Sequence, residues 1–161
     1  TPHGLGNHAV IITEPNEELM MKVKNLLEDL HYVGFSNFDI KYDKRDGKFK
    51  FFEINTRQGR SNYYVTGSGF NVAKYIVEEY VYGKELKLKL AKDEHLWMVV
   101  PKAVAFKYVK EEANKAKLRK LIKEKKMVNP VFMRGDLKPR RFLAMAKTHL
   151  SHFVKFKKYY S

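Results

Sequence analysis

The chain has 161 residues, of which 44% are hydrophobic and 14% aromatic, and a formal net charge of +14. This composition excludes a disordered chain, and the absence of Cys excludes disulfide bonds and thiolate metal sites. No segment resembles a signal peptide or reaches the roughly 20 apolar residues that span a bilayer, so a cytoplasmic location is expected.

The charge is distributed unevenly along the chain. Residues 1–95 contain 14 Lys/Arg and 14 Asp/Glu, whereas residues 96–161 contain 18 Lys/Arg and 4 Asp/Glu. We therefore predict two domains, 1–94 and 95–161, of which only the second carries the net charge that attracts anions.

The first predicted domain begins with a strand over residues 9–12 and a helix from Pro15 to Leu30. Glu17 and Glu18 lie in the first turn of that helix, where the helix dipole favours acidic residues.

Residues 38–55 have the pattern of a β-hairpin. Hydrophobic residues of the first strand alternate with polar ones, as in a half-buried strand: Phe38, Ile40 and Tyr42 alternate with Asp39, Lys41 and Asp43. A turn follows in which Gly47 can take a positive φ. Strict alternation then predicts that one face of the return strand carries Phe49, Phe51, Glu53 and Asn55.

Symmetric pairing about residue 46 would place Asp39 opposite Glu53 and Lys41 opposite Phe51. Two carboxylates directly opposite each other destabilise a sheet, so a cation is expected between them. A divalent ion such as Mg²⁺ suits carboxylate and amide oxygens. Lys41 is the rival cation, and a solvated strand pair with no bound ion is the third interpretation.

A loop is expected over 56–69, and a helix over 71–82 with Gly83 as its C-cap. Arg57 and Arg60 in the loop could balance the nearby acids. In the second predicted domain the expected elements are strands over 96–100 and 103–108, a charged helix over 110–125, a loop over 129–139 and a helix over 140–159.

The letters FDIKYD, a turn and FFEINTR resemble the metal-binding hairpin of the ATP-grasp superfamily of carboxylate–amine ligases. The pattern of that family is an acidic residue on one strand and Glu-hydrophobic-Asn-x-Arg on the next, matched here by Asp39, Glu53, Asn55 and Arg57. The segment from 59 to 86 also resembles carbamoyl-phosphate-synthase-like members. The letters NTRQGRSNYYV are most similar to the D-aspartate ligases of lactic acid bacteria.

The resemblance implies an α+β fold. Residues 1–94 would form the C-terminal lobe of an ATP-grasp domain, an antiparallel sheet with flanking helices, and residues 95–161 a basic, mostly helical module. The implied reaction is ATP-dependent amide formation through an acyl phosphate, which in D-aspartate ligases joins D-aspartate to the lysine side chain of a peptidoglycan precursor. The family's adenine pocket and phosphate clamps precede the matched segment, so the chain is expected to be a fragment that is inactive without the remainder of that domain.

The resemblance also assigns roles to residues. Asp39, Glu53 and Asn55 would hold Mg²⁺ or Mn²⁺, and Arg57 would be catalytic. Substrate contacts are expected from Arg60, Ser61 and Asn62. From the charge distribution, we add Arg140 and Arg141 as residues that attract an anionic precursor.

The expected partners are ATP, a small carboxylic acid and an amine-bearing, anionic precursor. Two alternatives stay open. One is a carbamoyl-phosphate-synthase-like enzyme of the same superfamily. The other is a binding module whose basic second domain docks on nucleic acid or on an anionic membrane, because Lys and Arg alternate there with Phe and Tyr. Nucleic acid is the less expected partner, since such a module would leave the acidic hairpin unused.

Overall fold

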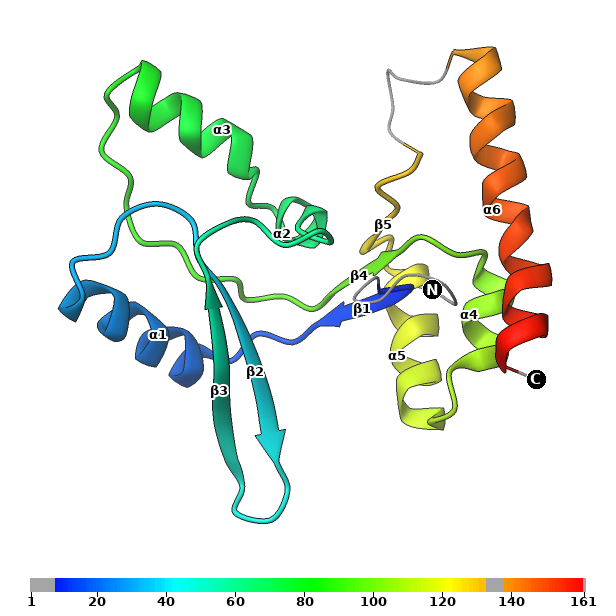
Figure 1. The fold of residues 1–161 in the computed structure, drawn as a ribbon, viewed down its shortest axis with the longest axis horizontal. Coiled ribbons are helices and arrows are strands. Elements are labelled where there is room, and N and C mark those ends of the chain that lie inside the picture. The colour runs from blue at the N-terminus through cyan, green and yellow to red at the C-terminus, as the bar shows by residue number, and fades with distance from the viewer. Residues whose placement is uncertain (1–7, 133–137, 161) are drawn as a thin grey trace. The chain divides into compact units, whose positions relative to one another are not determined.

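The computed structural model describes residues 8–132 and 138–160 (Figure 1). The chain forms two compact units, which are described separately. One unit is Asn16–Asn62, and the other contains the described residues before Asn16 together with those from Tyr63 onward. The predicted division at residues 94 and 95 was drawn from charge and stays a prediction.

The unit Asn16–Asn62 contains helix α1 (Glu17–Asp29) and the hairpin strands β2 (Asn37–Asp43) and β3 (Lys48–Asn55). The Asn16 side chain caps α1 by accepting a hydrogen bond from the Leu19 backbone N at 2.9 Å. Gly47 has a φ of +68° in the turn between the strands, as predicted. The helix and the hairpin therefore form where the sequence indicates, within two residues.

The hairpin register confirms one predicted pair and corrects another. Asp39 lies opposite Glu53 as expected, but Lys41 lies opposite Lys50 and not Phe51. The cause is a β-bulge beside Asp39, in which Phe52 has no partner on β2.

The bulge sorts the side chains of β3 onto two faces. Residues directly opposite on paired strands share a face, so Phe49 and Phe51 lie with Tyr42 and Ile40. The prediction that they share a face with Glu53 and Asn55 is wrong. This arrangement brings aromatic rings of the two strands into contact. The ring centroids of Phe38 and Phe51 are 5.8 Å apart, and those of Tyr42 and Phe49 are 5.2 Å apart.

This apolar face of the hairpin lies beside the beginning of α1. Phe49 and Phe51 line a shallow hollow together with Leu19 and Lys22 of the helix. The opposite face of the hairpin is polar and carries Asp39 and Glu53. Phe49 and Phe51 thus lie beside α1, and Asp39 and Glu53 lie on the other face of the hairpin.

The other unit is built on a three-stranded sheet. Its order is β1 (Val10–Thr13), β4 (His95–Met98) and β5 (Met127–Val128), with β1 and β4 antiparallel and β4 and β5 parallel. Helices α4 (Lys102–Tyr108), α5 (Glu112–Lys123) and α6 (Pro139–Tyr160) complete the core. The buried residues of this core are Leu96, Met98, Val100, Val104, Ala105, Leu118, Leu121 and Phe156.

Two predictions of secondary structure are wrong in this unit. Residues 103–108 form helix α4 rather than a strand, because a short apolar run fits either element and Pro101 has a fixed φ that suits a helix start. Part of the predicted loop forms α2 (Tyr63–Gly67). A Cβ on Gly67 would lie 2.5 Å from Val128, so this glycine permits close packing of α2 on β5.

The remaining helices follow the prediction closely. The helix expected over 71–82 is α3 (Val72–Ile76) continued by the π-helical turn η1 (Val77–Val81), and Gly83 ends it with a φ of +60°. The predicted strand over 96–100 and helices over 110–125 and 140–159 correspond to β4, α5 and α6. Among the described residues, no helix is long and apolar enough to cross a bilayer.

Candidate functional site

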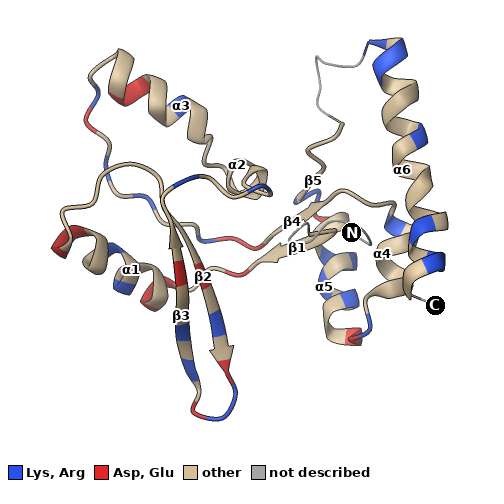
Figure 2. Ribbon diagram, viewed as in Figure 1, with Lys and Arg blue, Asp and Glu red and all other residues tan. Residues whose placement is uncertain are grey.

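Two carboxylates face each other on the polar side of the hairpin. Asp39 of β2 and Glu53 of β3 are direct cross-strand partners, and the acidic segments of the two strands lie at the same level in Figure 2. The Cβ atoms of such partners are about 5 Å apart. Both side chains are exposed, so the pair can be reached from solvent.

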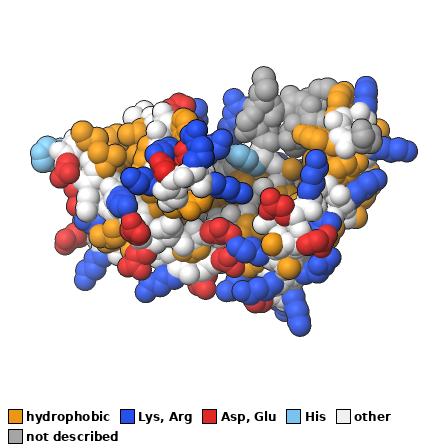
Figure 3. Space-filling view, turned by 90° about the horizontal axis from the view of Figure 1, so that it is seen from below, with side chains coloured by type: hydrophobic (Ala, Val, Ile, Leu, Met, Phe, Trp, Pro, Cys, Tyr) orange, Lys and Arg blue, Asp and Glu red, His pale blue; other side chains and the backbone are white. Residues whose placement is uncertain are grey.

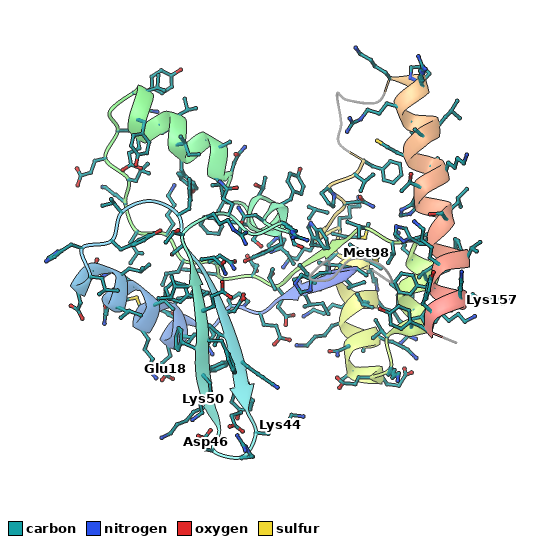
Figure 4. The ribbon with its side chains drawn as sticks, viewed as in Figure 1. Glu18, Lys44, Asp46, Lys50, Met98 and Lys157 are labelled. Carbon is teal, nitrogen blue, oxygen red and sulfur yellow. The ribbon has the colours of Figure 1, made fainter. Side chains whose placement is uncertain are left out.

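The other acids of the hairpin have cationic partners. Asp43 accepts two hydrogen bonds from the Arg45 guanidinium, at 2.7 Å to Nη2 and 3.0 Å to Nε. Asp46 accepts one from Lys50 Nζ at 2.5 Å, and both residues are labelled in Figure 4. These hydrogen bonds lower the pKa of both carboxyl groups.

Asp39 and Glu53 have no such partner. Within residues 8–132 and 138–160, neither carboxylate takes part in an ion pair or a side-chain hydrogen bond. Lys41, the rival cation, lies one pair further along the same face opposite Lys50. Arg57 donates to the backbone oxygen of Gln58 at 3.3 Å. Among the described residues, therefore, no cation forms an ion pair with either acid.

Amide groups continue this polar face beyond the acids. Asn37 and Asn55 are cross-strand partners two residues along from Asp39 and Glu53. The Asn37 side chain also lies near Gly59, where a Cβ would be 3.5 Å from its Oδ1. Asn37 was not among the predicted site residues, although the period-two pattern places it on the face of Asp39.

The loop after β3 holds the predicted substrate residues in a closed turn. The Asn62 backbone N donates to the Gly59 carbonyl at 3.1 Å, and its Nδ2 donates to Gln58 Oε1 at 3.0 Å. Arg60 and Ser61 lie within this turn, next to the end of β3. Arg57 is exposed at the start of the loop.

At the end of the polar face away from the turn, the groups that can bind a metal are hard oxygen donors. Two carboxylates and two amide groups suit Mg²⁺ or Mn²⁺, and Mg²⁺ usually takes one or two carboxylates and completes its shell with water and phosphate. The described residues contain no cluster of three or more His, Asp or Glu arranged around a metal position. The hairpin can thus supply part of a coordination sphere and leave positions open for a ligand.

The remaining two predicted site residues belong to the other unit. Arg140 and Arg141 lie in the first turn of α6, and both are exposed. Arg134, which belongs to the loop predicted before that helix, is outside the described residues.

The fold and the hairpin define a mixed α/β protein with an exposed carboxylate pair suited to a hard divalent cation. The chain is 38% identical, over 99% of its length, to the D-aspartate ligase of Enterococcus faecium (strain Aus0004). This confirms the resemblance to D-aspartate ligases. The chain spans 39% of the length of that relative. No protein-family model matches the chain, and no solved structure matches it.

Proposed function

We propose that this chain contributes the metal-binding hairpin to an ATP-dependent ligase of the ATP-grasp type. The observation that carries the proposal is the pairing of Asp39 with Glu53, neither offset by a cation, in a chain 38% identical to a D-aspartate ligase. In this proposal the unit Asn16–Asn62 belongs to the C-terminal lobe of an ATP-grasp domain. The basic part from residue 95 onward is a separate functional module.

The proposed reaction has two steps. A carboxylate oxygen of the acid substrate attacks the γ-phosphorus of ATP, and ADP leaves. An amine then attacks the carbonyl carbon of the acyl phosphate, inorganic phosphate leaves, and an amide forms. The substrates we propose are D-aspartate and the lysine side chain of a peptidoglycan precursor.

The hairpin residues have different proposed roles, which follow from the chemistry of their side chains. Asp39, Glu53 and Asn55 hold a Mg²⁺ or Mn²⁺ ion, with Asn37 as a further amide on the same face. When bound, the ion neutralises charge on the phosphates of ATP. Arg57 presents a planar set of donors that fits a phosphoryl group or a carboxylate.

The loop after β3 positions the substrate. The hydrogen bonds that Asn62 donates to the Gly59 carbonyl and to Gln58 Oε1 fix the turn that carries Arg60 and Ser61. A fixed turn holds its polar groups in place before the substrate binds, which reduces the entropy lost on binding. We assign Arg60, Ser61 and Asn62 to substrate binding on this basis.

A chimaera tests the proposed function directly. Residues 1–161 replace the matched segment of the Enterococcus faecium D-aspartate ligase, and amide formation from D-aspartate is measured with ATP and Mg²⁺. We expect the chimaera to be active. Glu53→Gln should lower its kcat on the order of 100-fold, because a charge that stabilises the transferring phosphoryl group is lost.

Asp43→Asn is the matched control. Asp43 lies on the same polar face, but Arg45 already pairs with it. Removal of the Asp43 charge should therefore leave kcat nearly unchanged. A chimaera that folds and binds ATP yet forms no amide would reject D-aspartate ligase activity for this chain. Equal rates for Glu53→Gln and the unsubstituted chimaera would reject the site.

A further inference from the structure

Helix α6 combines basic charge with exposed hydrophobic side chains. Its 22 residues (Pro139–Tyr160) include no Asp or Glu, and Figure 2 shows only basic colouring along it. The basic residues are spread over its whole length: Arg140, Arg141, Lys147, Lys155, Lys157 and Lys158. The helix therefore attracts anions along its entire length.

One side of α6 packs on its own unit. Phe156 is buried, and its ring centroid lies 5.2 Å from that of Tyr108 in α4. His149 Nδ1 lies 3.0 Å from the carbonyl oxygen of Val99, and the His149 ring contacts that of Phe132. These contacts fix which face of the helix points to solvent.

The opposite side exposes large aliphatic residues. Leu143, Leu150 and Val154 are 69%, 61% and 71% exposed. Their spacing of seven and four residues places them within about 40° of one another around a helix. Phe142 and Phe153, also exposed, widen this apolar stripe toward the packed face.

Lysines border the stripe. Lys147 and Lys158 lie within about 60° of Leu143 around the helix axis. On the face of the molecule drawn in Figure 3, exposed hydrophobic side chains are scattered among those of Lys and Arg. A surface of this kind matches a ligand with apolar material below a layer of negative charge.

We propose that the stripe of Leu143, Leu150 and Val154, with Lys147 and Lys158, docks α6 on an anionic membrane surface. The aliphatic side chains would enter the boundary between headgroups and acyl chains, while the lysines bind anionic headgroups. The helix lies on the membrane and does not cross it, in keeping with the lack of a bilayer-spanning helix among the described residues.

The aliphatic residues favour a membrane over nucleic acid. Single-stranded nucleic acid binds to aromatic rings on which bases stack, whereas the most exposed residues of the stripe are Leu and Val. A nucleic acid could pair with the lysines but would leave the stripe in water. Only an anionic ligand with an apolar layer uses both kinds of side chain.

Vesicle sedimentation of the 161-residue chain tests the proposal. The chain should bind vesicles of phosphatidylcholine mixed with phosphatidylserine, and bind pure phosphatidylcholine far more weakly. Leu150→Asp with Val154→Asp should weaken binding about tenfold or more, because burial of two aliphatic side chains is lost. Lys147→Gln with Lys158→Gln should weaken it about fivefold for each cation removed.

Val33→Asp provides the matched control. Val33 is 85% exposed and belongs to the other unit, so its substitution places one exposed Asp, half the charge of the double variant, away from α6 and should leave binding intact. Circular dichroism of each variant checks that α6 remains helical. Equal binding to both vesicle types would overturn the proposal, and so would an equal loss of vesicle binding with Val33→Asp. It would also be overturned if a short single-stranded DNA displaced the chain from vesicles while the aspartate variants kept their vesicle binding.

Discussion

Asp39 and Glu53 differ from the neighbouring carboxylates in their surroundings rather than in their chemistry. Asp43 and Asp46 each accept a hydrogen bond from a cation, whereas the described residues offer none to Asp39 or Glu53. Symmetric pairing about residue 46 predicted their direct opposition, but in the structure it depends on the bulge, because the pairs nearer the turn are one residue out of that register. Their lack of partners could not be predicted, because it depends on where Arg45, Lys50 and Arg57 direct their flexible side chains.

Asp39→Asn should weaken Mn²⁺ binding to the chain. The substitution removes one of two facing charges and with it a principal ligand of the ion. Loss of a residue that only supports a metal ligand lowers affinity roughly 10–100-fold, so the Mn²⁺ affinity should fall by at least that much. Electron paramagnetic resonance of free Mn²⁺ during a titration measures this affinity directly.

Asp43→Asn should leave the Mn²⁺ affinity unchanged in the same titration. It removes one negative charge from the same face of the same strand, so it reports any effect of net charge alone. If both variants lose affinity equally, Mn²⁺ responds to the charge of the hairpin and no site exists at Asp39.

At the scale of elements, the bulge at Phe52 determines what each face of the hairpin carries. Strict alternation along β3 placed Phe49 and Phe51 with Glu53, and this was wrong because contact with Phe38 and Tyr42 favours an extra residue in the strand. The apolar run after Pro101 was misassigned for a related reason. Its periodicity does not distinguish strand from helix, and packing of Val104 and Ala105 in the core decides.

Deletion of Phe52 should leave Mn²⁺ binding and the hairpin intact. Without Phe52 the strand becomes regular, and Phe51 and Glu53 still fall on opposite faces. If β3 had no bulge, the same deletion would turn Glu53 and Asn55 toward the other face and abolish binding. Titration with Mn²⁺ and the nuclear Overhauser contact between Phe38 and Phe51 together distinguish these outcomes.

Deletion of Ile54 is the matched control for that experiment. Ile54 pairs with Phe38, so its loss should move Asn55 to the apolar face or force a new bulge. We expect weaker Mn²⁺ binding in this variant. Equal behaviour of the two deletions would contradict the observed register.

At the scale of the whole molecule, charge and packing divide the chain differently. The net charge lies after residue 95, but β4, which begins at His95, pairs with β1 near the other end of the chain. Charge could be read from the sequence because it is a sum over residues. The β1–β4 pairing could not, because nothing local to either strand specifies a partner more than 80 residues away.

We expect the beginning of α6 to bind the proposed anionic precursor. Arg140 and Arg141 lie in the first turn of this helix, where the helix dipole adds partial positive charge. Charge reversal of both in the chimaeric ligase should raise KM for the anionic amine substrate, more at low salt, and leave KM for ATP little changed. Steady-state kinetics at two salt concentrations measure both constants.

Lys147→Glu with Lys158→Glu is the control, because it makes the same change in charge further along the same helix. If Arg140 and Arg141 bind the precursor, this second variant should leave KM for the amine close to that of the chimaera. An equal rise in both variants would mean that the field of α6 as a whole attracts the precursor. An unchanged KM in both would leave Arg140 and Arg141 without a part in substrate binding, and the basic charge of α6 would then serve the membrane surface alone.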